Sequence, residues 1–234
     1  MSSTISALII IPAYNEAECI LTTARAVEAA GYDYVIVNDG SHDETLEICK
    51  ENGLNVVDLP LNLGIGGAVQ TGHKYAQRYG YSIDVQIDGD GQHDPKYLPS
   101  LIKAIESGAD LVIGSRFLNH STGFRSTFFR RIGIGWLSKW IKVLTGKIIT
   151  DPTSGFRACG ERAIDLFCES YPVDYPEPDS IATALRKGLN VQEIPVEMRE
   201  RQGGVSSIGG FSGVYYMVKV TLAIWIACMN RYVQ

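Results

Sequence analysis

Short apolar runs alternate with longer helical patterns along the first half of the chain, and this alternation constrains the fold more than any other feature. The apolar runs predict buried strands at residues 7–11, 34–37, 55–59, 83–87 and 110–113. The segments with helical spacing lie between them, at residues 16–30, 43–51, 68–78 and 95–107. Strands that alternate with helices indicate a mostly parallel sheet covered on both faces. The sequence therefore predicts an α/β, Rossmann-like fold with helices flanking the sheet.

A polar segment follows each of the first four predicted strands. These segments are residues 12–16, 38–41, 62–67 and 88–94. In open parallel sheets, ligands bind outside the carboxyl ends of the strands. We therefore expect the four segments to meet at one rim of the sheet and to form a binding site there.

The segment after the fourth strand carries the clearest chemical signal, because it reads Asp88-Gly89-Asp90-Gly91-Gln92-His93. Hard divalent cations such as Mg²⁺ and Mn²⁺ prefer carboxylate and other oxygen ligands. Asp88 and Asp90, with Gln92, are therefore the predicted metal ligands. The alternative is a turn with solvated charges, but three other polar strand ends nearby favour the metal. His93 is expected to lie behind the ligands or at the surface.

Two further rim features allow two interpretations each. The glycine-rich segment around Gly64 is neither a GxGxxG fingerprint, since its sixth position is Val69, nor a Walker loop, since it lacks Lys-Ser/Thr. Its glycines form either a tight turn or a ligand contact. Asp39 either belongs to a helix-capping segment with Ser41 or Asp43, or it places a carboxylate at the rim for a base or ribose.

Bulk composition limits the classes of partner and the cellular compartment that the sequence favours. The net charge is −5, which gives no indication of nucleic-acid binding. The five cysteines are scattered and form no CxxC pair, which favours reduced thiols in a cytoplasmic protein. The N-terminal apolar run is short and lacks a basic lead, so it predicts a strand rather than a signal peptide.

Six motifs in order carry a family resemblance. They are IIPAYNE, VIVNDGSHDET, LNLGIGGAVQTG, VQIDGDGQHDP, LVIGSRF and DPTSGFRA. The chain resembles the family 2 inverting glycosyltransferases of GT-A fold from about residue 9 to residue 207. Within that family it is most similar to the dolichol-phosphate mannose synthase and polyprenyl-phosphate glucosyltransferase branch. It departs from many relatives at Gly89, where they have Ala, and at Ile65, where they have Lys.

The resemblance implies a role for each rim residue. The nucleotide sugar would contact Pro12, Ala13, Tyr14, Glu16, Asp39, Gly64, Asp88, Arg199 and Arg201. The metal, Mg²⁺ or Mn²⁺, would be held by Asp88, Asp90 and Gln92. The acceptor side would be lined by Ser154, Gly155, Phe156 and Arg157. The catalytic residues would be Asp90, Asp151 and Arg199. The implied reaction moves a hexose, with a UDP-glucose-type donor favoured, to a polyprenyl phosphate such as undecaprenyl or dolichyl phosphate.

The acceptor decides whether a general base is needed. A phosphate monoester has its second pKa near 6, so a lipid phosphate reaches the site largely as a dianion and needs no base. A hydroxyl acceptor must lose a proton in the transition state. Asp151, Glu177 and Asp179 are the candidate bases for that case, and capping or ion-pair roles are the alternative for each.

A basic, acid-free stretch suggests where the acceptor comes from. No Asp or Glu lies between Asp110 and Asp151, whereas seven of the 21 Lys and Arg residues do. Within the segment 124–148, residues 129, 132, 136, 140 and 143 follow a helical period. Apolar side chains bordered by cations are typical of a helix at an anionic membrane surface. A core-packed helix with a solvated basic face is the alternative.

The C-terminal apolar segment, residues 211–229, is nearly long enough to span a bilayer. Lys219 near its middle would be costly in hydrocarbon. We therefore expect an amphipathic helix on the membrane or at a subunit contact in a homo-oligomer, with a single span the lesser option. The predicted organisation is a glycosyltransferase domain over residues 1–208 and an apolar helix within 209–234, peripheral at the cytoplasmic face of the membrane.

Three functions remain open at this point. The first is transfer to a polyprenyl phosphate, and the second is transfer to a sugar hydroxyl in cell-wall or surface polysaccharide assembly. The third is a membrane-bound partner that binds nucleotide without turnover, and Asp88, Asp90 and Arg199 argue against it.

Overall fold

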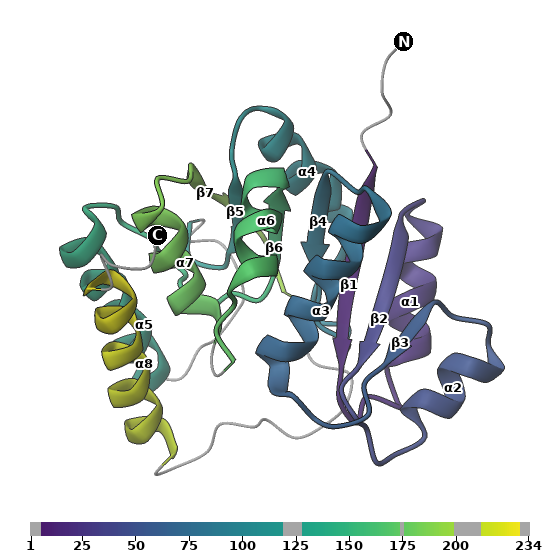
Figure 1. Ribbon diagram of the computed structural model, residues 1–234. Coiled ribbons are helices and arrows are strands. Elements are labelled where there is room, and N and C mark those ends of the chain that lie inside the picture. The colour runs from purple at the N-terminus through teal and green to yellow at the C-terminus, as the bar shows by residue number, and fades with distance from the viewer. Residues whose placement is uncertain (1–5, 119–127, 174–175, 199–211, 230–234) are drawn as a thin grey trace.

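The computed structural model describes residues 6–118, 128–173, 176–198 and 212–229, and within them the chain forms a seven-stranded sheet (Figure 1). The strands are β1 (Ala7–Ala13), β2 (Asp33–Asn38), β3 (Val56–Asp58), β4 (Ile83–Gln86), β5 (Leu111–Ser115), β6 (Arg157–Gly160) and β7 (Val191–Pro195). Their order across the sheet is β3-β2-β1-β4-β6-β5-β7. Every neighbouring pair is parallel except those made by β6, which runs antiparallel to both β4 and β5.

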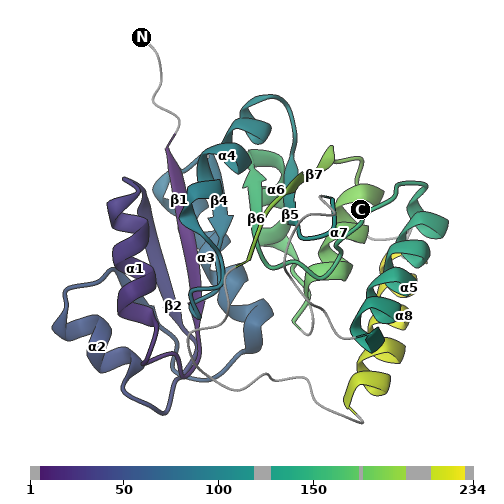
Figure 2. The same ribbon diagram turned by 180° about the vertical axis from the view of Figure 1, so that it is seen from behind.

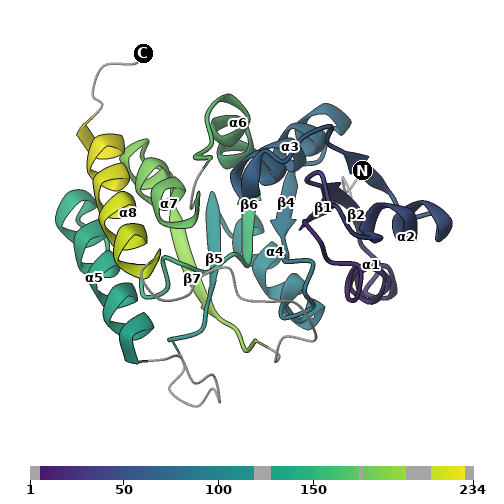
Figure 3. The same ribbon diagram turned by 90° about the horizontal axis from the view of Figure 1, so that it is seen from below.

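The helices cover both faces of this sheet (Figure 3). They are α1 (Ile20–Ala29), α2 (Thr45–Glu51), α3 (Gly64–Tyr79), η1 (Pro95–Tyr97), α4 (Leu98–Glu106), α5 (Phe128–Thr145), α6 (Glu161–Glu169), α7 (Pro176–Arg186) and α8 (Ser212–Met229). One face carries α1 and α4, with α2 beside α1, and the other carries α3, α6 and α7. The predicted α/β class and the mostly parallel sheet are confirmed.

The sequence of β1 shows why it lies at the centre. All seven of its residues are buried. Ile9 and Ile11 join the core cluster under α1 and α4, whereas Leu8 and Ile10 join the cluster under α3. A strand covered on both faces reads as a continuous apolar run rather than an alternating one, which is the pattern that made this strand predictable.

The two largest differences between the predicted and observed element boundaries are at the starts of two helices. The first helix begins at Ile20 rather than residue 16, because Glu16 to Cys19 form a turn at the rim. The third helix begins at Gly64 rather than residue 68, so the glycine-rich segment forms its first turn instead of a separate loop. A helix that starts with glycine can lie against neighbouring backbone, which is the reason a propensity scale misses this turn.

Strands β6 and β7 were not predicted from the sequence. β6 is only four residues long, and its place between β4 and β5 is set by pairing with strands that are distant in sequence. β7 then pairs with β5 at the edge of the sheet. β6 begins at Arg157, within the acceptor-side motif, and β7 follows later in the chain at one edge of the sheet.

A further helical layer lies outside α7. Helices α5 and α8 contact each other and both contact α7, and they lie side by side in Figures 2 and 3. Val220 and Ile224 of α8 enter the same core cluster as Leu137 and Ile141 of α5. In the described part of the chain, no helix is both long enough and apolar enough to cross a bilayer.

Candidate active site

The predicted rim exists, and hydrogen bonds hold its segments together. The carboxyl ends of β1 and β2 lie at the lower edge of the sheet in Figure 1. The backbone N–H of Asn15, after β1, donates to Ser41 Oγ at 3.0 Å, and that of Asp39, after β2, donates to the Ala13 carbonyl at 2.9 Å. The Leu63 N–H donates to Asp39 Oδ1 at 2.7 Å. The segments after β1, β2 and β3 therefore form one connected surface.

Asp39 links two of these segments rather than capping a helix. Burial raises the pKa of its carboxyl, and the N–H groups of Leu63 and Gly64 oppose that rise by donating to it. The capping interpretation placed the cap at Ser41 or Asp43. Ser41 accepts from Asn15, whereas Asp43 accepts from the N–H of Thr45, the first residue of α2, as a capping side chain does, and from that of Ala17.

The donor-side residues predicted after β1 lie at this rim. Pro12 and Ala13 end β1, and Tyr14 follows with an exposed ring that meets the edge of the His42 ring at 6.3 Å. The Glu16 N–H donates to Thr45 Oγ1 at 2.9 Å, which fixes the turn before α1. An exposed aromatic ring beside a buried carboxylate gives a nucleoside both a stacking surface and a hydrogen-bond acceptor.

The two aspartates of the Asp-Gly-Asp motif follow β4 directly. The Asp88 side chain is 39% exposed and reaches the rim, whereas Asp90 is 6% exposed. Asp90 Oδ1 accepts a hydrogen bond from the Gln92 N–H at 3.0 Å, and Gly91 adopts a left-handed conformation that closes this turn. A carboxylate has two oxygens with about four lone-pair sites, so it can bind a cation while it keeps a hydrogen bond of this kind.

Of the two places expected for His93, the structure shows the one behind the Asp-Gly-Asp motif rather than the one at the surface. Its ring is 3% exposed and stacks on Phe156 with 4.8 Å between ring centroids. Burial lowers its pKa to about 4, so the ring is neutral at pH 7. Its Nδ1 can then accept the backbone N–H of Asp88, which lies at 3.0 Å. The histidine was visible in the motif, but its stacking on a residue of the distant DPTSGFRA motif could not be read from the sequence.

Asp151, predicted as catalytic, is sealed by an ion pair. It has no exposed surface, and its two carboxylate oxygens receive Nε and Nη2 of Arg116 at 2.6 and 2.7 Å. The Arg116 backbone N–H donates to it as well. A fully buried carboxylate whose two oxygens are both bound by a guanidinium is not placed to take a proton from an acceptor, so the geometry supports a structural role for Asp151. Arg116 was not predicted as a site residue.

The acceptor-side residues divide into one that faces the motif and three that support it. A Cβ added to Gly155 would lie 3.1 and 3.3 Å from the two carboxylate oxygens of Asp88. Ser154 Oγ donates to the Gly114 carbonyl, and Phe156 is buried against His93. Arg157 is 3% exposed, and its guanidinium donates to Ser180 Oγ at 2.7 Å and to the Ser154 carbonyl.

Glu177 and Asp179 lie in the first turn of α7. Burial raises the pKa of Glu177, while the Arg157 charge opposes the rise and the Asp88 charge adds to it. Burial likewise raises the pKa of Asp179. A carboxyl group with a raised pKa near the reacting groups is suited to proton transfer, so both remain candidate bases. Arg199 and Arg201, predicted to contact phosphates, lie outside the described residues.

The glycines at the start of α3 serve packing. A Cβ on Gly66 would clash with the backbone carbonyl of Pro172, and one on Gly67 would clash with Leu63. The close approach joins α3 to the segment that leads into α7. The contact is the reason that this turn contains glycine at these two positions.

We expect Gly66→Ala to destabilise the protein, because the clash is with backbone rather than with a side chain that can rotate. The loss should be about 1–3 kcal/mol, as for other overpacked sites. Urea unfolding followed by circular dichroism would measure it. Gly53→Ala is an informative comparison, because Gly53 has open space around its Cβ position and only a left-handed φ of 65° to oppose the substitution. A larger loss at Gly53 would contradict the packing explanation.

Comparison with known proteins identifies the family. The family model described as glycosyl transferase family 2 matches residues 8–163. The chain belongs to this family. It is a glycosyltransferase of the hexosyltransferase class, as the motifs indicated.

Two curated relatives match over nearly the whole chain. Polyprenol monophosphomannose synthase of Mycolicibacterium smegmatis is 33% identical over 225 residues, which cover 91% of this chain and 84% of the relative. Undecaprenyl-phosphate mannosyltransferase of Micrococcus luteus is 33% identical over 230 residues, which cover 93% of each chain.

The fold is also similar to a solved structure. It is glucosyl-3-phosphoglycerate synthase from Mycobacterium tuberculosis, in complex with Mn²⁺, UDP-glucose and phosphoglyceric acid. The TM-score is 0.71 at 17% identity, and the match covers 96% of this chain and 80% of that one. This similarity supports the predicted GT-A-like architecture.

A second group of ligand-type side chains lies inside the core, away from the rim. His73 of α3, Asp84 of β4 and Cys159 of β6 are all buried, and they offer ligand atoms within 4.8 Å of one another. His73 Nδ1 lies 2.7 Å from Asp84 Oδ2. Burial raises the pKa of the Cys159 thiol well above its ordinary value. The group joins α3 to the sheet, and nothing in its described contacts connects it to transfer chemistry.

Proposed function

We propose that this glycosyltransferase moves a hexose from a nucleotide sugar to a polyprenyl phosphate at a membrane surface. Both curated relatives act on a polyprenyl-type phosphate according to their names, and the chain covers most of their length. The observation that carries the proposal in this protein is an exposed apolar and basic surface on α5 and α8.

The donor would bind at the rim formed after β1, β2 and β4. The nucleoside would contact Pro12, Ala13, Tyr14, Glu16, Asp39 and Gly64. The exposed Tyr14 ring and the buried Asp39 carboxylate support this placement. The diphosphate would lie toward Asp88, with Arg199 and Arg201 closing over it. Arginine suits that role because its planar guanidinium binds phosphate oxygens in pairs.

The residues of the Asp-Gly-Asp motif fit a divalent cation. Asp88 and Asp90 offer hard oxygen atoms at the end of a rigid strand, and Gln92 lies in the same turn. Mg²⁺ and Mn²⁺ commonly bind through one or two carboxylates together with substrate phosphates. When bound, the cation would stabilise the negative charge that develops on the leaving nucleoside diphosphate. The protein's part is to position the two aspartates: His93 accepts the backbone N–H of Asp88, and the Gln92 N–H donates to the Asp90 carboxylate.

The surface on α5 and α8 fits a membrane. Exposed apolar side chains follow one face of α5 at Ile132, Trp136 and Val143, which are 51–74% exposed. Those of α8 are Val218, Leu222, Trp225 and Ile226, at 44–55% exposed. The two helices are joined where Trp136 Nε1 donates to Thr221 Oγ1 and Trp140 Nε1 donates to the Thr221 carbonyl.

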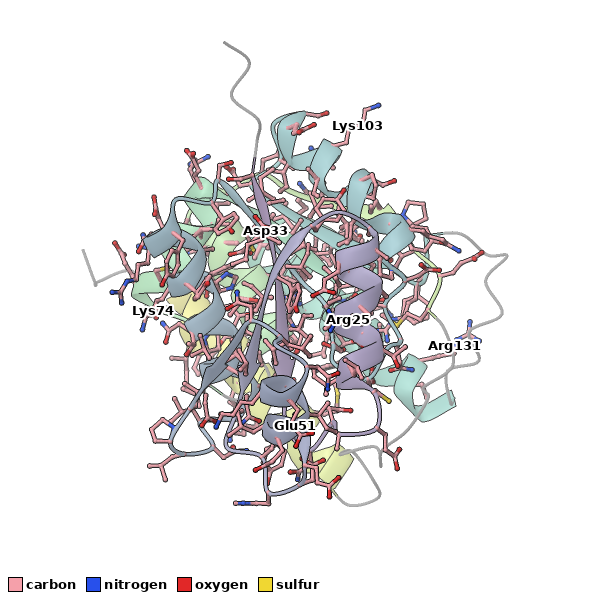
Figure 4. All side chains as sticks on the ribbon, turned by 90° about the vertical axis from the view of Figure 1, so that its right-hand side faces the viewer. Arg25, Asp33, Glu51, Lys74, Lys103 and Arg131 are labelled. Carbon is pink, nitrogen blue, oxygen red and sulfur yellow. The ribbon has the colours of Figure 1, made fainter. Side chains whose placement is uncertain are left out.

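Three of the residues predicted to form the apolar face of the basic segment are therefore exposed. Leu137 and Ile141, on the other side of α5, enter the core instead. Exposed Arg131, Lys139 and Lys142 border the apolar face, and Arg131 can be seen projecting from the surface in Figure 4. Exposed apolar side chains bordered by cations favour an anionic lipid surface. A lipid surface there would supply a polyprenyl phosphate.

Binding to anionic vesicles tests this surface. We expect the triple variant Arg131→Gln, Lys139→Gln, Lys142→Gln to bind vesicles with phosphatidylglycerol more weakly, because each cation near such a leaflet contributes about 1 kcal/mol. Co-sedimentation at two salt concentrations would measure it, and wild-type binding should weaken as salt is raised.

The matched control removes three charges elsewhere. Lys50, Lys74 and Lys103 are exposed on other elements, and Figure 4 labels the last two. Their triple replacement by Gln should leave most of the binding in place. Equal losses in the two triple variants would mean that net charge, and not this surface, drives association.

Product chemistry tests the proposed acceptor. Purified protein would be given long-chain polyprenyl phosphate with a panel of donors that includes UDP-glucose, favoured by the sequence resemblance, and a nucleotide-linked mannose. A lipid-linked product from which mild acid releases the sugar is expected. A product stable to that treatment would contradict a sugar–phosphate linkage.

A second candidate function is transfer to a sugar hydroxyl, and Glu177 favours it. Glu177 is half-buried, its carboxyl has a raised pKa, and the Asp88 charge contributes to that rise, so it is placed to accept a proton. A lipid phosphate would need no such group. Glu177→Gln therefore separates the two functions, since it should abolish transfer to a hydroxyl and leave transfer to a dianionic phosphate largely in place.

A further inference from the structure

Gln86 has a buried side-chain donor that nothing in the described protein satisfies. It is the last residue of β4, two positions before Asp88, and it is 4% exposed. Among the described residues, its Nε2 has no hydrogen-bond partner. An unmade hydrogen bond at a buried donor costs roughly 1–3 kcal/mol. A bound ligand or an ordered water would supply the missing hydrogen-bond acceptor.

Its neighbour across the sheet cannot complete it. Gln86 pairs with Arg157 of β6, so the two side chains leave the sheet on the same face. A guanidinium has only donors. Those of Arg157 already go to Ser180 Oγ and the Ser154 carbonyl. The Gln86 amide therefore faces a neighbour that can offer it no acceptor.

Gly155 lies between this amide and the Asp-Gly-Asp motif and lets the two come close together. A Cβ at Gly155 would lie 3.4 Å from Gln86 Nε2 and 3.1 Å from Asp88 Oδ1. One small region thus has a neutral donor on one side and a carboxylate on the other. It borders the Asp88 side chain, which is 39% exposed and reaches the rim.

The chemistry of this region favours a hydroxyl group. A hydroxyl can accept from the Gln86 amide and donate to a carboxylate at the same time. An ionised phosphate oxygen can accept from the amide, but it has no proton to donate to the carboxylate. The hexose is the part of the donor that carries hydroxyl groups next to the reacting carbon.

We infer that the Gln86 side-chain amide donates a hydrogen bond to a hydroxyl of the transferred hexose and so helps to select the sugar. The inference rests on the proposed function only in taking a nucleotide hexose as donor. It does not depend on the identity of the acceptor. Gln86 acts on the bound donor through binding, and it moves no proton.

The test compares binding of the nucleotide sugar with binding of the matching nucleoside diphosphate, in the absence of acceptor. Gln86→Leu keeps a similar volume and removes the amide. We expect affinity for the nucleotide sugar to fall about tenfold, the value of one neutral hydrogen bond, while affinity for the diphosphate stays the same. Calorimetry would give both constants. An equal loss for both ligands, or no loss for either, would overturn the inference.

Gln70→Leu is the matched control. Gln70 is a half-buried amide on α3 that donates to the Phe167 and Cys168 carbonyls, away from the rim. Its removal should leave the ratio of the two affinities unchanged.

A deoxy-sugar series tests the same contact in the wild-type protein, which covers the case in which Gln86→Leu does not fold. The wild type should bind one monodeoxy donor about tenfold more weakly than the parent sugar. In Gln86→Leu that difference should disappear for the same donor. A wild type that binds every monodeoxy donor equally well would rule out a hydroxyl contact. Failure of transfer to polyprenyl phosphate would overturn the proposed acceptor and leave this binding result standing.

Discussion

Asp90→Asn should lower kcat/KM for transfer by at least about a hundredfold, the loss typical of removing one group that stabilises transition-state charge. The substitution removes the negative charge, and the oxygen of the new side-chain amide can still accept from the Gln92 N–H, so the turn after β4 should persist. Stability should therefore change by no more than about 1 kcal/mol. Steady-state transfer assays and urea unfolding would measure the two quantities separately.

Removal of divalent cations with a chelator should lower activity to a similar extent, and added Mg²⁺ or Mn²⁺ should restore the wild type but not the variant. Asp33→Asn is the control, because Asp33 begins β2 at the other end of the sheet and accepts from the Tyr81 hydroxyl. Full activity in the presence of chelator would exclude the metal from the reaction. Full activity of Asp90→Asn would exclude this carboxylate.

The second large effect is expected in stability. Arg116→Met removes the cation that faces Asp151, a carboxylate with no exposed surface. Removing one partner of a buried ion pair leaves the other charge uncompensated and lowers the free energy of unfolding by about 3–5 kcal/mol. For a chain of this length each kcal/mol corresponds to roughly 2–4 °C in Tm. Differential scanning calorimetry should therefore show a clear fall in Tm.

Two further variants test whether burial of the ion pair is the cause of the lost stability. Adding Asp151→Asn to Arg116→Met removes the unpaired charge and should recover part of the lost stability. Arg162→Met breaks an ion pair with Asp110 in which the Arg162 side chain is 64% exposed, so it should cost less than about 1 kcal/mol. If the Arg162 and Arg116 variants lost the same stability, burial of the pair would not be the reason.

The rim at the strand ends could be predicted because its signals are local. An apolar strand followed by Asp-Gly-Asp is a pattern within a few residues, and parallel strands bring such ends to one rim. The structure confirms that the segments after β1, β2 and β3 are hydrogen-bonded together. The basic helix was likewise predictable from its period, and three residues of its predicted apolar face are exposed, although the sequence left a core-packed helix as the alternative.

The acceptor side could not be predicted in the same way, because its geometry depends on pairing between distant segments. Asp151 was expected to act on the substrate, yet Arg116, 35 positions earlier, encloses it. The role of Gln86 depends on Gly155 and Arg157, which the antiparallel strand β6 brings against β4.

The sequence by itself determined the α/β class, the rim and the Asp-Gly-Asp motif, since each follows from residue patterns with a short period. The tertiary structure alone decided the place of β6, the burial of Asp151 and the face of α5 that meets solvent. Those outcomes depend on which segments pack together, and the free energy of burial is a property of the packed molecule rather than of any segment read alone.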